Sequence, residues 1–280
     1  MEIIPKINYL PVKTTTLPPH RATNSYVIGE NSTAVLIDAI SNQLSEFKTF
    51  LFDKGIEKIQ FALITHMHPD HYNGLNEIIE DFGGKPVAHE VKQYRLERIF
   101  DKKDISMILK GGESLEADGF TIKALHTPGH SPDHICFYIE KEGILFSGDT
   151  ILGRGTSIIS PPEGNMAVYI KTLKELLKLD INIICPAHGP IIQKKATECI
   201  QWYLDHRLMR EDLIYNSLKQ GPKSTREIAE SIYTEEDFKM HGRDLLPRAE
   251  RSVLAHLEKL EEEGRVLLVE TDKPHRYGIT

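Results

Sequence analysis

The H-x-H-x-D-H segment at residues 66–71 constrains this chain more than any other part of it. The segment follows a β-rich run at 58–66 and precedes a run at 75–82 whose apolar residues recur at helical spacing. His66 and His68 are two apart and point the same way in an extended chain. Imidazole and carboxylate groups suit zinc, and they also bind iron or manganese. The segment therefore predicts a metal site in a strand-to-helix loop.

Three further candidate ligands follow, each beside a Gly or Pro at the end of a β-rich run: His130, Asp149 and His188. Taken singly, each could be an ordinary loop residue. The chain has 13 histidines in 280 residues, and at that frequency the first motif would arise by chance on the order of once in several hundred such chains. The whole series, in this order, favours a metal centre over a set of solvated loops.

β-rich runs alternate with helical patterns through the first two-thirds of the chain. Helices are expected at 75–82 and 166–179, and strands at 25–29, 33–39, 58–66, 86–89, 120–127, 134–140, 143–149 and 181–188. The turn signal at 30–32 predicts a hairpin between the first two strands. This mixture indicates an α+β architecture in which helices cover sheets.

The last quarter of the chain has a different pattern. An amphipathic helix is expected from about 206 to 220, and a short helix should follow Ser224, with Glu227 at capping-box spacing. A third helix is expected from Pro247 to Gly264, and the strand-like 266–270 would form a β-wing. We therefore predict two domains, a catalytic domain at 1–205 and a winged-helix-like domain at 206–280.

Composition limits the classes of function and location. The net charge of −7 gives no electrostatic footprint for nucleic acid. No apolar run approaches the roughly 20 residues that cross a bilayer, and the N-terminal MEIIPKINYL lacks a signal-peptide pattern. A cytoplasmic protein with no membrane partner is expected. The three scattered cysteines predict no disulfide framework, and Cys136 and Cys185, in apolar runs, should be core thiols.

The order of these motifs resembles the metallo-β-lactamase superfamily, in which H-x-H-x-D-H is followed by a His, an Asp and a His. The segment ILGRGTSII at 151–159, the run at 169–173 and the C-terminal module look like the lactamase-beta-2-like branch. That branch joins a lactamase-type domain to a C-terminal winged-helix-like domain. The resemblance implies a four-layer αβ/βα sandwich with the site at one edge of its two sheets.

The resemblance also implies a binuclear centre with two Zn²⁺ ions, for which Fe or Mn are alternatives. Its ligands would be His66, His68 and His130 for one ion, Asp70, His71 and His188 for the other, and Asp149 as the bridge. Asp70 would also be catalytic, because it can orient the nucleophile or move a proton. Two cations sharing one water lower its pKa from about 16 toward about 7, and the resulting hydroxide would attack the substrate.

Other positions near the motifs have more than one interpretation each. Asp38 either orients a histidine ligand or is a solvated carboxylate at a strand end. His134 is a further ligand, an acid or a structural histidine, and the structural interpretation is favoured because the ligand set is complete without it. Tyr72 and Asn73 either reach substrate or serve the turn, and Arg154 either meets an anionic substrate group or lies at the surface.

We expect a metal-dependent hydrolase, and two substrates are compatible with it. The first is a small ester or thioester, which fits the acidic charge balance. The second is single-stranded RNA, since endoribonuclease activity is known in the lactamase-beta-2-like branch. RNA cleavage needs cations and stacking aromatic rings near the metals, and the candidates are Lys92, Tyr94, Arg95 and Arg98. β-Lactamase activity itself is not expected, because such enzymes are typically exported.

A third hypothesis, from another class, is a nucleic-acid-binding regulator that acts through the winged helix. The expected recognition helix carries Arg248 and Arg251, but phosphates would be repelled by its glutamates: Glu250, Glu258, Glu261, Glu262 and Glu263. A winged helix used for packing or for a homodimer is the better interpretation.

Overall fold

The computed structural model describes residues 1–16, 20–40, 44–101, 105, 107–234, 246–272 and 274–280. These residues form two compact units, and each unit is described by itself. Unit 1 comprises Met1–Thr127, Asp133–Ser157 and Asp180–Thr197, and unit 2 comprises Pro128–Pro132, Ile158–Leu179 and Glu198–Thr280. No helix in the described ranges is long and apolar enough to cross a membrane.

The first sheet of unit 1 contains seven strands in chain order: β1 (Glu2–Ile4), β2 (Ile7–Lys13), β3 (Ala22–Ile28), β4 (Ser32–Ile37), β5 (Ile56–Leu63), β6 (Lys85–His89) and β7 (Met107–Leu109). β1 to β4 pair antiparallel, and the predicted hairpin joins β3 to β4. Its turn includes Asn31 at φ 50, a left-handed backbone that asparagine tolerates well. β4 to β7 pair parallel, so helical crossovers must connect them.

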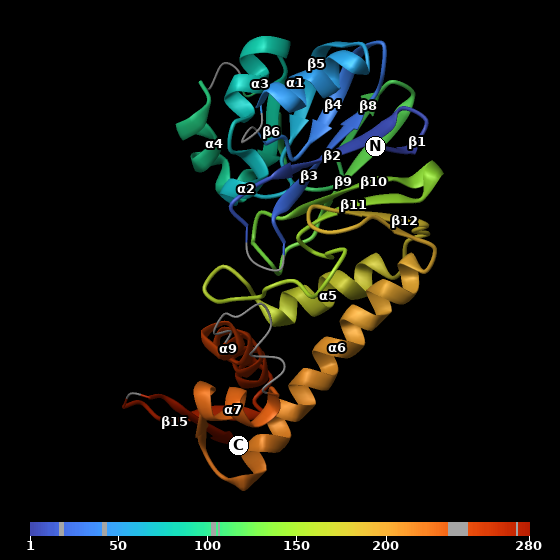
Figure 1. Ribbon diagram of the computed structural model, residues 1–280. Helices are drawn as coiled ribbons and strands as arrows, with labels where there is room; N and C mark the ends of the chain where they lie inside the picture. Colours follow the sequence, from blue (N-terminus) through green and yellow to red (C-terminus); the bar gives the residue numbers. More distant parts are fainter. Residues whose placement is uncertain (17–19, 41–43, 102–104, 106, 235–245, 273) are drawn as a thin grey trace. The chain divides into compact units, whose positions relative to one another are not determined.

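Three crossover helices cover one face of this sheet (Figure 1): α1 (Leu44–Asp53), α3 (Leu75–Phe82) and α4 (Gln93–Ile99). α3 matches its predicted range, buries Leu75 and Ile78, and ends at Gly83, whose φ is 68. These side chains join a core that also includes Phe47, Ile59 and Leu96. The helices are amphipathic because one face of each supplies this core.

The second sheet of unit 1 has the strand order β13 (Ile192–Gln193), β12 (Ile183–Pro186), β11 (Ile144–Gly148), β10 (Ile135–Ile139), β9 (Phe120–His126) and β8 (Ser114–Ala117). β11 and β12 are parallel, and the other neighbours are antiparallel. A core containing residues of both sheets includes Tyr26 and Phe146, whose rings meet edge to face with centroids 5.0 Å apart. Every strand predicted for this unit is present, with shifted ends.

The cysteines match the sequence expectation. Cys136, Cys185 and Cys199 are free thiols, and the first two are buried. Burial raises the pKa of Cys136 to about 12, and it also raises the pKa of Cys185. Cys136 and Cys185 are therefore confirmed as core thiols, which are inert because the thiolate is the reactive form.

The described residues of unit 2 include the helices α5 (Met166–Leu176), most of α6 (Ala196–Ser217), α7 (Thr225–Ile232) and α9 (Leu246–Glu262). They also include a sheet of β14 (Lys223–Ser224), β16 (Arg276–Ile279) and β15 (Val266–Glu270). Ser224 and Glu227 form the predicted capping box. The unit has its own core, which includes Ile228, Val253 and Leu257.

α6 differs from the prediction at its N-terminal end. The helix expected from about 206 begins at Ala196 instead. The reason is that Ile200, Tyr203 and Leu204 continue the buried face of the helix toward its start. The predicted domain boundary at 205 lies inside this continuous helix, and it stays a prediction.

Candidate metal centre

The predicted ligands of unit 1 lie just beyond the ends of its strands. The H-x-H-x-D-H segment follows β5, Asp149 follows β11, and His188 comes two residues after β12. Because β11 and β12 are parallel neighbours, Asp149 and His188 emerge from the same edge of the sheet. Asp70 and His71 lie in α2 (Pro69–Tyr72), a single turn that begins with proline, a residue that suits the first helical position.

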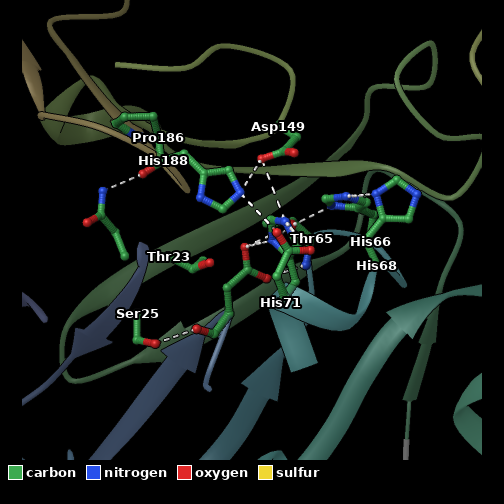
Figure 2. Close-up of polar contacts among 12 residues, drawn as sticks. Thr23, Ser25, Thr65, His66, His68, His71, Asp149, Pro186 and His188 are labelled. Carbon is green, nitrogen blue, oxygen red and sulfur yellow. Dashed lines mark hydrogen bonds and ion pairs between the residues drawn. The ribbon is translucent and has the colours of Figure 1, made fainter. Parts of the chain in front are cut away.

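Four predicted ligands converge in unit 1, and Figure 2 shows three of them, His71, Asp149 and His188. His71 Nε2 lies 3.8 Å from Asp70 Oδ1 and 3.6 Å from Asp149 Oδ1. His188 Nε2 lies 3.5 Å from Asp70 Oδ2 and 3.3 Å from Asp149 Oδ1. Asp149 thus contacts both histidines, as a shared carboxylate would.

The first two histidines of the motif face each other beside this group. His66 Nε2 and His68 Nδ1 are 2.8 Å apart. The centroids of the His66 and His71 rings are 4.0 Å apart. One ligand atom each from His66, His71 and Asp149 lies within 4.8 Å of the others. The same is true of Asp70, His71 and His188.

Two buried nitrogens test whether these residues fit a metal ion. Nε2 of His71 and Nε2 of His188 have no hydrogen-bond partner in the part of the chain that the structure describes, and both residues are buried. Buried polar atoms are almost always hydrogen-bonded, so an exception calls for an explanation. A cation held by imidazole and carboxylate explains both atoms.

The opposite nitrogens of the histidines are held by the protein. His71 Nδ1 lies 2.9 Å from Asp38 Oδ2, and His188 Nδ1 donates to the carbonyl oxygen of Ala22 at 2.9 Å. His130, which belongs to unit 2, donates from Nδ1 to the carbonyl oxygen of Ile158 at 2.8 Å. A ligand histidine typically uses one nitrogen in this way and presents the other to the metal. All three rings are therefore arranged to present Nε2.

Asp38 is an orienting residue and not a solvated carboxylate. Its side chain is buried, and it accepts hydrogen bonds from the backbone N–H and the hydroxyl of Thr65 at 2.9 and 2.8 Å. With the His71 contact, both of its oxygens are used. Of the two interpretations of Asp38, the structure supports the first.

The charges around the site change the pKa values of its members. Burial alone would lower the pKa of His71, but the carboxylates of Asp38 and Asp149 outweigh burial and raise the pKa to about 9. Burial also lowers the pKa of His188, and Asp149 and Asp70 raise it further than burial lowers it. The pKa of Asp70 is held well below its usual range: burial would raise it, but His188 and His71 lower it more. The site therefore attracts positive charge strongly.

A polar stretch of β3 supports the His188 loop, and sequence reasoning missed it. Asn24 donates from its side chain to the carbonyl oxygens of Pro186 and Gly189 at 2.8 and 2.9 Å, and the Tyr26 hydroxyl donates to Pro186 at 2.7 Å. Ser25 donates to the carbonyl oxygen of Asp38. The available signal was the run Thr-Asn-Ser inside an otherwise apolar strand.

The remaining candidates take separate roles. His134 accepts the backbone N–H of Asp149 at 3.0 Å, in keeping with its structural interpretation. Tyr72 is partly buried against the core beneath the helices. Arg154 lies at the surface.

Two cations proposed for an RNA groove are engaged within the protein. Lys92 is buried, and its Nζ lies 3.1 Å from Asp133 Oδ1. Arg95 donates to the carbonyl oxygen of Met67 at 3.0 Å. Tyr94 is half exposed, with the Arg98 guanidinium 5.7 Å from its ring centroid. Because the ammonium of Lys92 is buried and paired, it is poorly placed to contact a phosphate.

Comparison with known proteins decides the family. Residues 18–188 match the model of the metallo-beta-lactamase superfamily, and residues 224–273 match that of the beta-lactamase associated winged helix domain. The chain belongs to the metallo-β-lactamase superfamily. Members of this superfamily are generally metal-dependent hydrolases, which confirms the predicted enzyme class and the predicted fold.

Relatives within the superfamily extend over most of the chain. A Beta-lactamase-like protein 2 homolog of Drosophila melanogaster is 29% identical over 258 residues, which cover 88% of this chain and 84% of the relative. A lactamase-like protein of Arthroderma gypseum is 30% identical over 263 residues, covering 88% and 78%. At 88% coverage, these matches include at least part of residues 224–273.

Solved structures share the fold. A metallo-beta-lactamase family protein from Thermus thermophilus has a TM-score of 0.75 at 23% identity and covers 100% of both chains. A beta-lactamase domain protein from Burkholderia ambifaria has a TM-score of 0.81 at 19% identity, covering 100% of this chain and 93% of that one. Identity this low shows the fold alone.

Proposed function

We propose that this chain is a binuclear zinc-dependent hydrolase that acts on a small ester or thioester. The observation that carries the proposal is the convergence of two aspartates on the buried Nε2 atoms of His71 and His188, which have no hydrogen-bond partner among the described residues. Membership in a superfamily of metal-dependent hydrolases supports the same chemistry.

The proposed ligand set follows the family pattern. His66, His68 and His130 would hold one ion, Asp70, His71 and His188 would hold the second, and Asp149 would serve both. His130 enters on the family resemblance, and its Nδ1 donates to the carbonyl oxygen of Ile158, as the second nitrogen of a ligand histidine typically does. Neutral imidazoles are required, so metal binding weakens in acid.

The chemistry divides between the ions and the chain. When bound, the ions supply a water of lowered pKa and a Lewis acid for the substrate oxygen. The ionised carboxylate of Asp70 accepts a hydrogen bond from the attacking water and orients it toward the substrate carbonyl. Asp38 and the carbonyl oxygen of Ala22 keep the His71 and His188 rings in place. Fixed positions matter because groups held in place need no reorganisation during the reaction.

The engaged cations favour the small substrate over RNA. Lys92 and Arg95 bind groups within the protein, and the chain carries a net charge of −7. Binding of single-stranded RNA without sequence preference requires a positively charged groove along the backbone. A small neutral ester or thioester needs no such groove.

The test compares two substrates and two matched variants. Zinc-loaded protein is incubated in parallel with a generic thioester and with labelled single-stranded RNA. The double variant His68→Ala, Asp149→Ala removes one proposed histidine ligand and one proposed carboxylate ligand. The control His275→Ala, Asp272→Ala makes the same two changes at exposed positions of the winged-helix region.

We expect thioester turnover in the parent and the control, and a loss of at least 100-fold in the His68→Ala, Asp149→Ala variant. RNA should stay intact with all three proteins. RNA cleavage that disappears only in the ligand variant would replace the proposed substrate with the nuclease alternative. Fewer than two metal ions per chain in the parent would overturn the binuclear assignment itself.

A further inference from the structure

Three consecutive residues, Asp133 and His134 just before β10 and Ile135 at its start, bind the backbone of two of the three loops of unit 1 that carry candidate ligands. Asp133 Oδ2 accepts the N–H of Met67 at 2.7 Å. His134 Nε2 accepts the N–H of Asp149 at 3.0 Å. Ile135 donates its N–H to the carbonyl oxygen of Thr65 at 2.8 Å. The three residues are all buried, so these bonds are shielded from competing water.

Met67 is the residue between the two facing histidines of the motif. Its N–H is bound by Asp133, and its carbonyl oxygen accepts from Arg95 at 3.0 Å. Its side chain is fully buried in the core beneath the helices. β5 ends at Leu63, so strand pairing no longer fixes the chain here. Side chains hold both polar groups of this residue instead, and they set the direction of His66 and His68.

Lys92 makes the buried carboxylate of Asp133 tolerable. An unpaired carboxylate in the interior is costly, whereas a hydrogen-bonded pair is accepted. Lys92 Nζ lies 3.1 Å from Oδ1, with side-chain exposures of 5% for Lys92 and 1% for Asp133. Oδ2 is thereby left to bind Met67. This pairing explains why a lysine is buried near a metal centre.

His134 performs the corresponding task for Asp149. Because Nε2 accepts a hydrogen bond, the ring proton is on Nδ1. Nδ1 lies 2.9 Å from Thr127 Oγ1 and 3.2 Å from Thr150 Oγ1, so one of these hydroxyls receives that proton's hydrogen bond. A Cβ on Gly148 would come within 2.6 Å of His134 Nε2, which shows how closely the ring meets the loop.

We propose that Asp133 and His134 are positioning residues of the metal centre, which together fix the loop of His66 and His68 relative to Asp149. Asp133 acts on one ligand pair through Met67, and His134 acts on Asp149 through its N–H. The two residues therefore have different effects. Loss of Asp133 lowers the affinity for one metal ion. Loss of His134 lowers the affinity for both ions, because Asp149 is proposed to serve both. The inference rests on the proposed binuclear centre.

The experiment measures metal binding and does not rely on catalysis. Asp133→Ala and His134→Phe remove the acceptors, while Asp133→Asn and His134→Gln keep an acceptor oxygen. Ile139→Ala is the matched control, a cavity at the other end of the same strand β10, where Ile139 pairs with Ile144 of β11. Zinc affinities come from chelator competition, metal content from elemental analysis, and ligand geometry from the visible spectrum of the Co²⁺-loaded protein. Thermal unfolding of each metal-free variant reports its stability.

We expect Asp133→Ala to lower the affinity for one zinc ion by about 10–100-fold, and His134→Phe to lower the affinity for both ions by a similar factor. Each variant should also have a changed Co²⁺ spectrum. Asp133→Asn and His134→Gln should recover part of the affinity, and they keep the test valid if the larger changes prevent folding. Ile139→Ala should lose stability but keep both affinities.

Two results would overturn the positioning roles. One is parent-like affinities in all four variants at Asp133 and His134. The other is an equal loss of affinity in Ile139→Ala at the same loss of stability, which would reduce the effect to general destabilisation. A parent that binds fewer than two ions would instead refute the proposed function, so the two failures are distinguishable.

Discussion

The carboxylate of Asp38 binds two neighbouring residues, Thr65 and His71. It receives two hydrogen bonds from Thr65 and contacts His71 at 2.9 Å, and the φ of 53 at Asp38 places this residue in the left-handed region. Aspartate, like asparagine, adopts that backbone conformation more readily than most residues other than glycine. The conformation therefore favours a short polar side chain at this position.

Replacing Asp38 by Asn should lower the zinc affinity by about 10–100-fold, because the anionic partner that orients the His71 ring is lost. Asn tolerates the left-handed backbone, so the protein should still fold. Chelator competition measures the affinity, with Asp53→Asn, an exposed carboxylate of α1, as the control. Unchanged affinity in Asp38→Asn would show that the Thr65 and His71 contacts do not orient the ligand.

The sequence indicates candidate ligands more clearly than it indicates the residues that support them. His66, Asp70, Asp149 and His188 are visible because their residue types and spacing carry metal chemistry. Asp133 is not visible, because an aspartate in a loop is ordinary until Met67 and Lys92 are found beside it. A residue such as Asp133 binds backbone atoms that are distant in the sequence, so a local sequence pattern does not reveal it.

Helices α6 and α9 of unit 2 are joined by a buried polar cluster. Glu211 Oε1 accepts from Lys259 at 2.8 Å, and Glu211 Oε2 lies 3.5 Å from His256 Nδ1. Arg265 approaches the same carboxylate at 3.5 Å. Burial would raise the pKa of Glu211, but the neighbouring side chains of His256 and Lys259 lower it further than burial raises it. The carboxylate therefore contributes stability only while it is ionised.

Glu211→Gln should destabilise unit 2 by about 2 kcal/mol at pH 7, because a charge-assisted hydrogen bond to a buried lysine is weakened. A pKa lowered by folding gives stability that is present above the unfolded-state pKa and is lost as pH falls through the folded-state pKa. The difference between parent and variant should accordingly shrink below about pH 4. Thermal unfolding from pH 7 to pH 3 measures it, with Glu262→Gln, exposed on α9, as the control. A difference that stays constant with pH would contradict the ionic role.

Elements with strong periodicity were predicted more accurately than short or edge elements. α3 and α7 match because both have strong apolar spacing, Gly83 ends α3, and the capping box at Ser224 begins α7. β1 and β2 were not predicted, and β1 has only three residues, too few for an alternating pattern to show. α6 was predicted to start too late because its first turns carry Cys199 and Trp202 among polar residues, which hides the buried face.

Each compact unit contains a hydrophobic core of its own. Ile139 belongs to the core that contains residues of both sheets of unit 1, and Leu257 belongs to the core of unit 2. Units with separate cores can unfold in separate steps. The beta-lactamase associated winged helix model matches within unit 2, over residues 224–273, which agrees with a module that carries its own core.

Calorimetry should therefore resolve two unfolding transitions. Ile139→Ala should lower the midpoint temperature of one transition and Leu257→Ala that of the other. Each change should cost about 2–5 kcal/mol of unfolding free energy, because it leaves a cavity in a hydrophobic core. The variants serve as controls for each other. A single transition that both variants lower alike would show that the chain unfolds as one cooperative body.

The placement of the ligands just past the strand ends has a consequence for protein engineering. The sheets can be left untouched while a library varies the exposed residues beside the ligand loops, such as Arg154. Positions 133–135 must be excluded from that library. Asp133 and His134 precede β10 and therefore look like ordinary loop residues that could be varied. A designer who treated Asp133 as a free loop position would randomise a residue on which the alignment of the ligand loops is proposed to depend.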